Sequence, residues 1–168
     1  MHENFLAKMF EHNNWANQKV IEACRVLSDE QLDTEPQSAV RGNIRDTLIH
    51  LVTSQRGYLA LLTLPVDQRP TSPLEFTDLE ESVRTSGEGL LALANGERHP
   101  FEARLTTRDG HFTEPWVVML QVINHATEHR EQIKSMLTAL GVAPPDIDGW
   151  GYGLASDALV PITYKKET

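Results

Sequence analysis

The segment from Pro115 to Leu140 constrains the fold most strongly, because its apolar residues recur with the period of one long α-helix. Proline is favoured in the first turn of a helix, and Gly141 is a typical residue just beyond the last turn. At 100° per residue, a face about 80° wide carries the side chains expected to point inward. They are Val118, Val122, His125, His129, Ile133, Met136 and Leu140. A helix with one apolar face must pack against other helices, so this segment predicts a helical bundle.

Three further segments carry the same helical period, at about residues 3–27, 44–64 and 77–94. Together with the last helix they predict an all-α fold, a four-helix bundle. The connection over residues 65–73 holds three prolines and should be extended. Its length would let the third helix cross to another position, so we expect a bundle with a long crossover connection.

Capping signals mark the expected helix starts. Asn43 is the expected N-cap of the second long helix. Ser28 and Gln31 have the spacing of a capping box and predict a short helical turn after the first helix. Thr77 and Glu80 repeat that spacing and predict the start of the third long helix.

Two stretches lack a helical period. Between Phe101 and Glu114, apolar and polar residues alternate up to the turn pair Asp109 and Gly110. This pattern predicts a short β-hairpin before the last helix. The C-terminal tail, residues 146–168, is rich in glycine and aromatic residues and should pack as irregular chain over one end of the bundle.

Length and composition fit a single domain over residues 1–168, because 168 residues with 40% apolar content can bury one substantial core. The net charge of −9 argues against nucleic-acid and anionic-membrane partners. It is compatible with a small neutral or cationic substrate, and a small-molecule substrate is the expected partner. The lone cysteine, Cys24, can form no internal disulfide and is expected to be a small buried residue.

The first residues do not show the basic and then apolar pattern of a secretory signal peptide, and the sequence has no apolar run of about 18 residues that could span a membrane. We therefore expect a cytoplasmic protein.

Two histidines, His125 and His129, fall one turn apart on the inward face of the last helix. The spacing alone is weak, since seven histidines in 168 residues would give such a pair by chance in about 0.3 of sequences. Burial of both rings costs free energy unless each finds a partner, and two adjacent rings cannot both be protonated without repulsion. A divalent metal ion resolves this conflict by accepting a lone pair from each neutral ring.

A catalytic metal site commonly has three protein ligands, which calls for a third residue. We choose His50, because it lies inside the second helix. His99 and His111 fall in loop or hairpin, and His2 lies near the N-terminus. His50 sits about 120° from the centre of its apolar face, so the spacing also fits a histidine on the helix surface.

Four polar residues are candidates for a substrate pocket beside the ion. Ser54 lies one turn after His50 and is small enough to leave room for a ligand. His12 could flank the same cavity as an acid-base catalytic group, or it could be exposed. Asn13 and Asn17 face inward, where amides must be hydrogen-bonded, so they could line the pocket or could be satisfied by neighbouring helices or a trapped water.

Three stretches of the sequence resemble the DinB/YfiT-like superfamily of bacterial metalloproteins, which is distinct from the DNA polymerase with the same short name. They are NHATEHREQI at 124–133, followed by Leu140-Gly141 and Pro144-Pro145; NIRDTLIHL at 43–51; and NWAN at 14–17. The resemblance spans most of residues 1–145. It implies a four-helix bundle, metal ligands at His50, His125 and His129, nickel, zinc or iron as the ion, and frequent homodimers.

The resemblance is specific for the fold and the three histidines and says less about the reaction. Characterised relatives include thiol-dependent transferases and isomerases that use low-molecular-weight thiols. We therefore expect a metal-dependent enzyme in which the ion activates a thiol or water nucleophile, with a thiol-dependent S-transferase favoured and a hydrolase as the second version. The alternative is a non-catalytic metal-binding or stress-response protein that forms a dimeric bundle.

Overall fold

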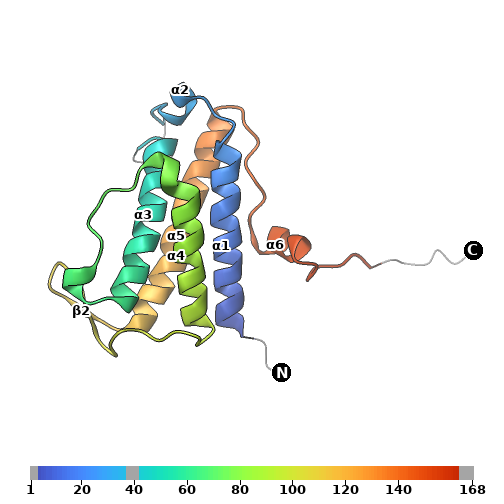
Figure 1. The fold of residues 1–168 in the computed structure, drawn as a ribbon. Helices are drawn as coiled ribbons and strands as arrows, with labels where there is room; N and C mark the ends of the chain where they lie inside the picture. Colours follow the sequence, from blue (N-terminus) through green and yellow to red (C-terminus); the bar gives the residue numbers. More distant parts are fainter. Residues whose placement is uncertain (1–3, 37–41, 163–168) are drawn as a thin grey trace, which may run out of the picture.

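The structure is a computed structural model that describes residues 4–36 and 42–162. Its four long helices run side by side (Figure 1). They are α1 (Phe5–Cys24), α3 (Ile44–Thr63), α4 (Leu79–Ala94) and α5 (Pro115–Ala139). Both α1 and α3 pack against α4 and α5, which places α1 and α3 at opposite corners of the bundle. The predicted all-α four-helix bundle is confirmed.

The connection from α3 to α4 runs back along the outside of the bundle, so these two helices point in the same direction (Figure 1). It contains two single 3-10 turns, η1 (Val66–Gln68) and η2 (Phe76–Asp78). The buried side chain of Leu74 fixes this segment to the core. The predicted crossover is therefore present.

Two of the three predicted capping signals form. Ser28 Oγ accepts a hydrogen bond from the backbone N–H of Gln31, whose side chain accepts one from Ser28 in return. This capping box begins the short helix α2 (Asp29–Leu32). The side chain of Asn43 caps α3 by accepting from the backbone N–H of Asp46 at 2.8 Å.

The capping box predicted from Thr77 and Glu80 is wrong. Thr77 lies inside the turn η2, and the residue at the N-cap position of α4 is Asp78, which makes no side-chain capping bond. The 3-10 turn moves the start of the regular helix past the threonine, so its hydroxyl donates to the Asp78 carboxylate instead.

The predicted hairpin is present and short. Strand β1 (Leu105–Thr106) pairs antiparallel with β2 (Phe112–Thr113), and Leu105 lies opposite Thr113. Gly110 in the connecting turn has a φ of +88°, a conformation that favours glycine.

The tail is more ordered than its sequence predicted, because residues Gly149–Ala155 form a short helix, α6. The side chain of Asp148 caps this helix by accepting from the backbone N–H of Gly151. Its glycines lower helix propensity and leave no apolar period, so the pattern gave no signal. The helix packs against the side of α1, not over an end of the bundle (Figure 1).

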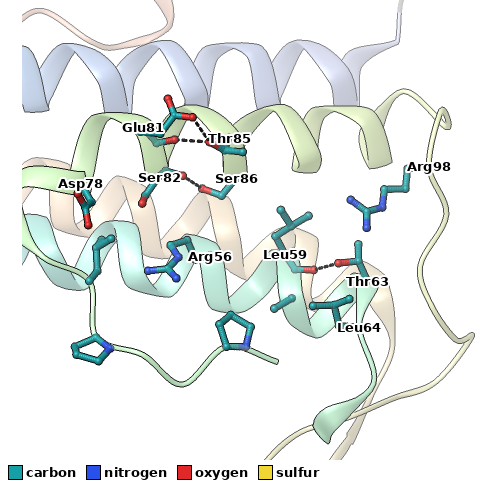
Figure 2. Close-up of a pocket in the computed structure, with 14 residues that line it drawn as sticks. Arg56, Leu59, Thr63, Leu64, Asp78, Glu81, Ser82, Thr85, Ser86 and Arg98 are labelled. Atoms are coloured by element: carbon teal, nitrogen blue, oxygen red, sulfur yellow. Dashed lines mark hydrogen bonds between the residues drawn. The ribbon is translucent and has the colours of Figure 1, made fainter. Parts of the chain in front are cut away.

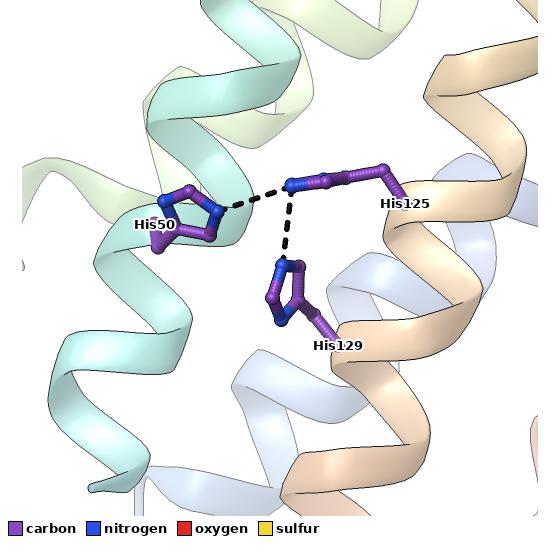
Figure 3. Close-up of side chains that lie close together, drawn as sticks. All are labelled: His50, His125 and His129. Atoms are coloured by element: carbon purple, nitrogen blue, oxygen red, sulfur yellow. Dashed lines mark hydrogen bonds between the residues drawn. The ribbon is translucent and has the colours of Figure 1, made fainter. Parts of the chain in front are cut away.

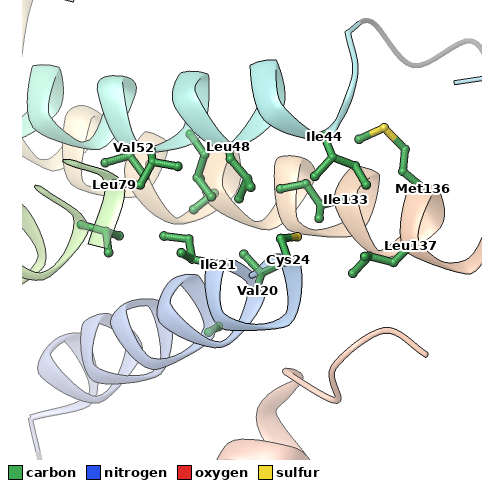
Figure 4. Close-up of a cluster of buried hydrophobic side chains, with 14 of the residues drawn as sticks. Val20, Ile21, Cys24, Ile44, Leu48, Val52, Leu79, Ile133, Met136 and Leu137 are labelled. Atoms are coloured by element: carbon green, nitrogen blue, oxygen red, sulfur yellow. The ribbon is translucent and has the colours of Figure 1, made fainter. Parts of the chain in front are cut away.

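The core is built from apolar side chains of all four long helices (Figure 4). Cys24 is 2% exposed within this cluster, as expected for a small buried residue. Burial raises the pKa of its thiol to about 12. None of the helices in the described part of the chain combines the length and the apolar character needed to cross a membrane.

Gly87 allows a close approach between α4 and α1. A Cβ atom at this position would lie 2.7 Å from Asn14 Oδ1, and the Asn14 side chain already donates to the Gly87 carbonyl at 2.9 Å. We expect Gly87→Ala to lower the free energy of unfolding by about 1–2 kcal/mol, although alanine is the better helix former. Gly57 in α3 is the matched control, since a Cβ there meets nothing within 4 Å. Denaturant unfolding should show Gly57→Ala stabilised by about 0.5–1 kcal/mol; an equal gain at both positions would contradict the close contact.

Candidate metal centre

The structure brings the three predicted ligands together between α3 and α5 (Figure 3). His50 comes from α3, and His125 and His129 come from neighbouring turns of α5. The Nε2 atom of His125 lies 3.1 Å from Nε2 of His50 and 3.1 Å from Nε2 of His129. One nitrogen from each ring lies within 4.8 Å of the other two. Rings from two helices thus meet at a common point.

The two separations from His125 fit ligands of a single ion. Two nitrogens bound at about 2.0–2.1 Å, at angles between octahedral and tetrahedral values, lie about 2.8–3.4 Å apart. Both Nε2 separations from His125 fall within this range. The three histidines are therefore positioned to hold one divalent metal ion.

The site lies on the flank of α5 and not in the centre of the core, which corrects the predicted orientation of the helix. The buried positions of α5 include Ala126 and Arg130, one residue beyond each histidine. His125 and His129 are half-buried, and His50 is exposed. Val118, Val122, Ile133 and Met136 are buried as predicted, but at 100° per residue the centre of the buried face lies about 40° from the predicted one, so the histidines lie at its edge and are partly open to solvent.

The surroundings keep two of the rings, those of His125 and His50, neutral. Burial, followed by the proximity of His129 and His50, lowers the pKa of His125 to about 4. Burial and then His129 also lower the pKa of His50 below its usual value. A neutral imidazole is the form that donates a lone pair to a metal ion, so the unprotonated rings are ready to bind at neutral pH.

Gln132 orients one of the ligands. Its Oε1 atom lies 2.8 Å from Nδ1 of His129, and an amide oxygen can only accept, so Nδ1 carries the proton. The lone pair of His129 is then on Nε2, the atom that faces the other two rings. The sequence analysis did not single out this glutamine.

We expect Gln132→Ala to weaken metal affinity by about 10–100-fold without unfolding the protein, because it frees the tautomer and rotation of His129. Competition with a coloured chelator measures this effect. Gln121 on the exposed side of the same helix is the matched control, and Gln121→Ala should bind metal like the wild type. Equal affinity for both variants would show that the amide does not orient the ring.

A sequence model described as the DinB family matches residues 1–157. The chain belongs to the DinB family. The protein named DinB from Bacillus subtilis (strain 168) is 27% identical over 164 residues, covering 90% of this chain and 93% of that protein. This match supports the resemblance to the DinB/YfiT-like superfamily.

Two solved DinB-family structures share the fold. A protein assigned to the DinB family from Exiguobacterium sibiricum 255-15 superposes with a TM-score of 0.62 at 18% identity, covering 81% of this chain and 92% of that one. A DinB-like protein from Bacillus cereus ATCC 10987 superposes with a TM-score of 0.59 at 16% identity, covering 85% and 95%. Membership of the DinB family and the three-histidine cluster together support a metal-binding protein.

His12, the predicted acid-base group, lies away from the metal centre of this DinB-family chain. Its Nε2 atom is 2.9 Å from the carbonyl oxygen of Ile147, and its ring packs beside Trp15 and Tyr152. These contacts attach the C-terminal segment to α1. The structure thus assigns His12 a contact with the tail and does not bring it to the three histidines.

Asn13 and Asn17 are completely buried, and their side-chain oxygens each accept a hydrogen bond of 2.7 Å from Arg130. Asn17 also donates to Gln55, which in turn donates to Ser86. One polar network therefore connects all four long helices. Asn17 is thus satisfied by neighbouring helices, one of the two predicted alternatives. Asn13 is satisfied only at its oxygen, because its Nδ2 atom is buried without a hydrogen-bond partner among the described residues.

Ser54 lines a pocket, and its assignment to a substrate pocket stays a prediction. The pocket has a volume of about 270 Å³, and its lining includes Tyr58. The Tyr58 ring stands edge-on to His125 with 5.7 Å between the ring centres. A larger pocket of about 470 Å³ lies between α3, α4 and the crossover segment and contains none of the histidines (Figure 2). The smaller pocket also has no histidine in its lining, and it borders the candidate metal centre through Tyr58.

Proposed function

We propose that this protein is a divalent-metal-dependent enzyme that transfers a group to the sulfur of a low-molecular-weight thiol. The observation that carries the proposal is the convergence of three imidazoles at a point open to solvent. No fourth histidine, cysteine, aspartate or glutamate joins the cluster among the residues that the structure describes. Three protein ligands with an open position are typical of catalytic sites, whereas structural sites are closed by four.

The protein groups have separate tasks at this site. A divalent ion held here would lower the pKa of a bound thiol or water, so that a nucleophile exists at neutral pH. His50, His125 and His129 hold that ion, and Gln132 fixes the lone pair of His129 toward it. Tyr58 forms an aromatic wall beside His125, where a substrate would pack.

The thiol must come from outside the protein. Cys24 is the only cysteine of the chain, and it is buried in the core with its pKa raised to about 12. A thiol in this state is neither accessible nor ionised at neutral pH. The resemblance to thiol-dependent transferases favours a free small thiol over water as the nucleophile, although the open position would also admit water.

The test uses protein purified without a histidine tag, loaded with zinc or nickel, and mixed with mercaptoethanol and monochlorobimane. The thiol sulfur forms a bond to the bimane carbon, chloride leaves with the electron pair of the broken bond, and the thiol proton goes to solvent. We expect metal-dependent formation of the fluorescent thioether above the uncatalysed rate. Hydrolysis of nitrophenyl acetate without any thiol would instead indicate a hydrolase.

The competing class, a non-catalytic metal-binding protein, predicts full metal loading with neither activity. A panel of thiols and electrophiles that gives no metal-dependent rate, while metal binds stoichiometrically, would reject the enzyme in favour of that class.

A further inference from the structure

The pocket that contains Ser54 continues the exposed face of α3 on which His50 lies. Ser54 and Tyr58 follow His50 at intervals of four residues, so they share its face about 6 Å and 12 Å farther along the helix. The ring of Tyr58, which lines the pocket, contacts the ring of His125, so the pocket borders the metal centre. A small molecule of ordinary length could therefore reach from the pocket to the three histidines.

Two arginines from different segments line the far side of this pocket. Arg69 belongs to the crossover segment and Arg108 to the hairpin turn, and both segments lie near the C-terminal end of α3 (Figure 1). Neither arginine was singled out by the sequence, because no helical period predicts how a connection and a hairpin meet.

Backbone carbonyls hold both side chains in place. Arg69 donates to the carbonyl oxygens of Leu64 at 3.1 Å and Thr106 at 2.6 Å. Arg108 donates to the carbonyl oxygens of Arg69 at 2.7 Å and Pro70 at 3.3 Å. Each guanidinium has five N–H groups, so several N–H groups on both side chains keep no protein acceptor within the described residues. The two guanidiniums are thus positioned but not saturated.

No carboxylate forms an ion pair with either arginine in the described part of the chain, and both side chains donate to backbone oxygens only. Burial and the nearby charge of Arg108 lower the pKa of Arg69, whereas the charge of Glu102 acts in the opposite direction. Two adjacent cations that form no ion pair with a carboxylate present a local positive charge in a chain with a net charge of −9, and such a charge attracts an anion.

We propose that Arg69 and Arg108 bind the carboxylate or phosphate group of a small-molecule substrate whose other end reaches the three histidines. Guanidinium groups recognise both anions through paired N–H donors, and partial burial strengthens such bonds. Ser54 and Tyr58 line the path between the two ends. The inference rests on the proposed function for the reaction at the histidines, but binding of the anion can be tested by itself.

Isothermal titration with hexyl phosphate, hexanoate and uncharged hexanol tests the anion site on the full chain. We expect the wild type to bind at least one anionic probe about tenfold or more tightly than hexanol. Arg108→Gln should remove this preference, and because Arg108 is exposed on the hairpin the variant should fold. Arg69→Lys, which keeps the charge but loses the paired donors, should weaken binding as well.

Arg98→Gln is the matched control, because Arg98 is exposed and lines only the larger pocket. It should bind the probes like the wild type. Equal binding of hexanol and the anions, or unchanged anion binding by Arg108→Gln, would overturn the assignment. A metal-free His125→Ala variant should keep the anion preference. A wild-type protein that binds the anions but no metal would therefore reject only the proposed function. A wild-type protein that catalyses the reaction without the anion preference would reject only this inference.

Discussion

Replacing His125 by alanine should abolish stoichiometric metal binding while leaving the helical bundle folded. His125 is the central ligand, since its Nε2 atom lies 3.1 Å from the corresponding atoms of both His50 and His129. Loss of a group that only orients a ligand lowers metal affinity by about 10–100-fold. Loss of the ligand itself should have a larger effect, so we expect metal affinity to fall by more than about 100-fold. Elemental analysis after dialysis and a chelator competition assay measure the loss.

His99→Ala is the control for this experiment. His99 is exposed and lies outside the cluster, so its removal should leave about one ion per chain. Circular dichroism should be unchanged for both variants, because His125 is half-buried at the flank of α5. Full metal loading of His125→Ala would show that the ion is held elsewhere.

Replacing Arg130 by alanine should be the most destabilising change in the core. Arg130 is 3% exposed and donates to Asn13, Asn17 and Thr127. Its removal leaves two buried amide oxygens without their donor and opens a cavity. We expect the free energy of unfolding to fall by about 3–5 kcal/mol in urea titrations.

Arg84→Ala is the matched control for the loss of an arginine. Arg84 forms ion pairs with Glu81 and Glu88 on the exposed side of α4, and such pairs contribute at most about 1 kcal/mol. Burial lowers the pKa of Arg130 to about 10, so the side chain remains charged at neutral pH in the folded protein. Equal losses for the two variants would show that the buried network does not hold the four helices together.

The positions of the long helices could be predicted because period and capping act locally. The last helix was predicted over Pro115 to Leu140 and ends at Ala139, and the second was predicted from its N-cap Asn43. The short helix α6 was missed, because its glycines oppose helix formation and its order depends on packing against α1.

The rotation of α5 could not be predicted from apolar residues alone. An arginine is ordinarily expected at the surface, so the predicted face excluded Arg130 and placed the histidines at its centre. Arg130 is buried because Asn13 and Asn17 on α1 present their oxygens to it. That arrangement exists only after the helices have packed.

The three histidines were predicted, whereas the groups around them were not. Residue type and spacing identified His125 and His129, and the family resemblance supported His50. Gln132 acts through a single hydrogen bond, and Arg69 and Arg108 come from segments without a period. Homodimer formation stays a prediction from the resemblance.

The most direct measurement is anomalous diffraction at the metal absorption edge from a crystal of the protein loaded with zinc or nickel. We expect one peak per chain between α3 and α5, about 2.0–2.1 Å from a ring nitrogen of each of His50, His125 and His129. A peak bound by other side chains, or one that leaves out the imidazole of His50, would contradict a shared ion between the two helices.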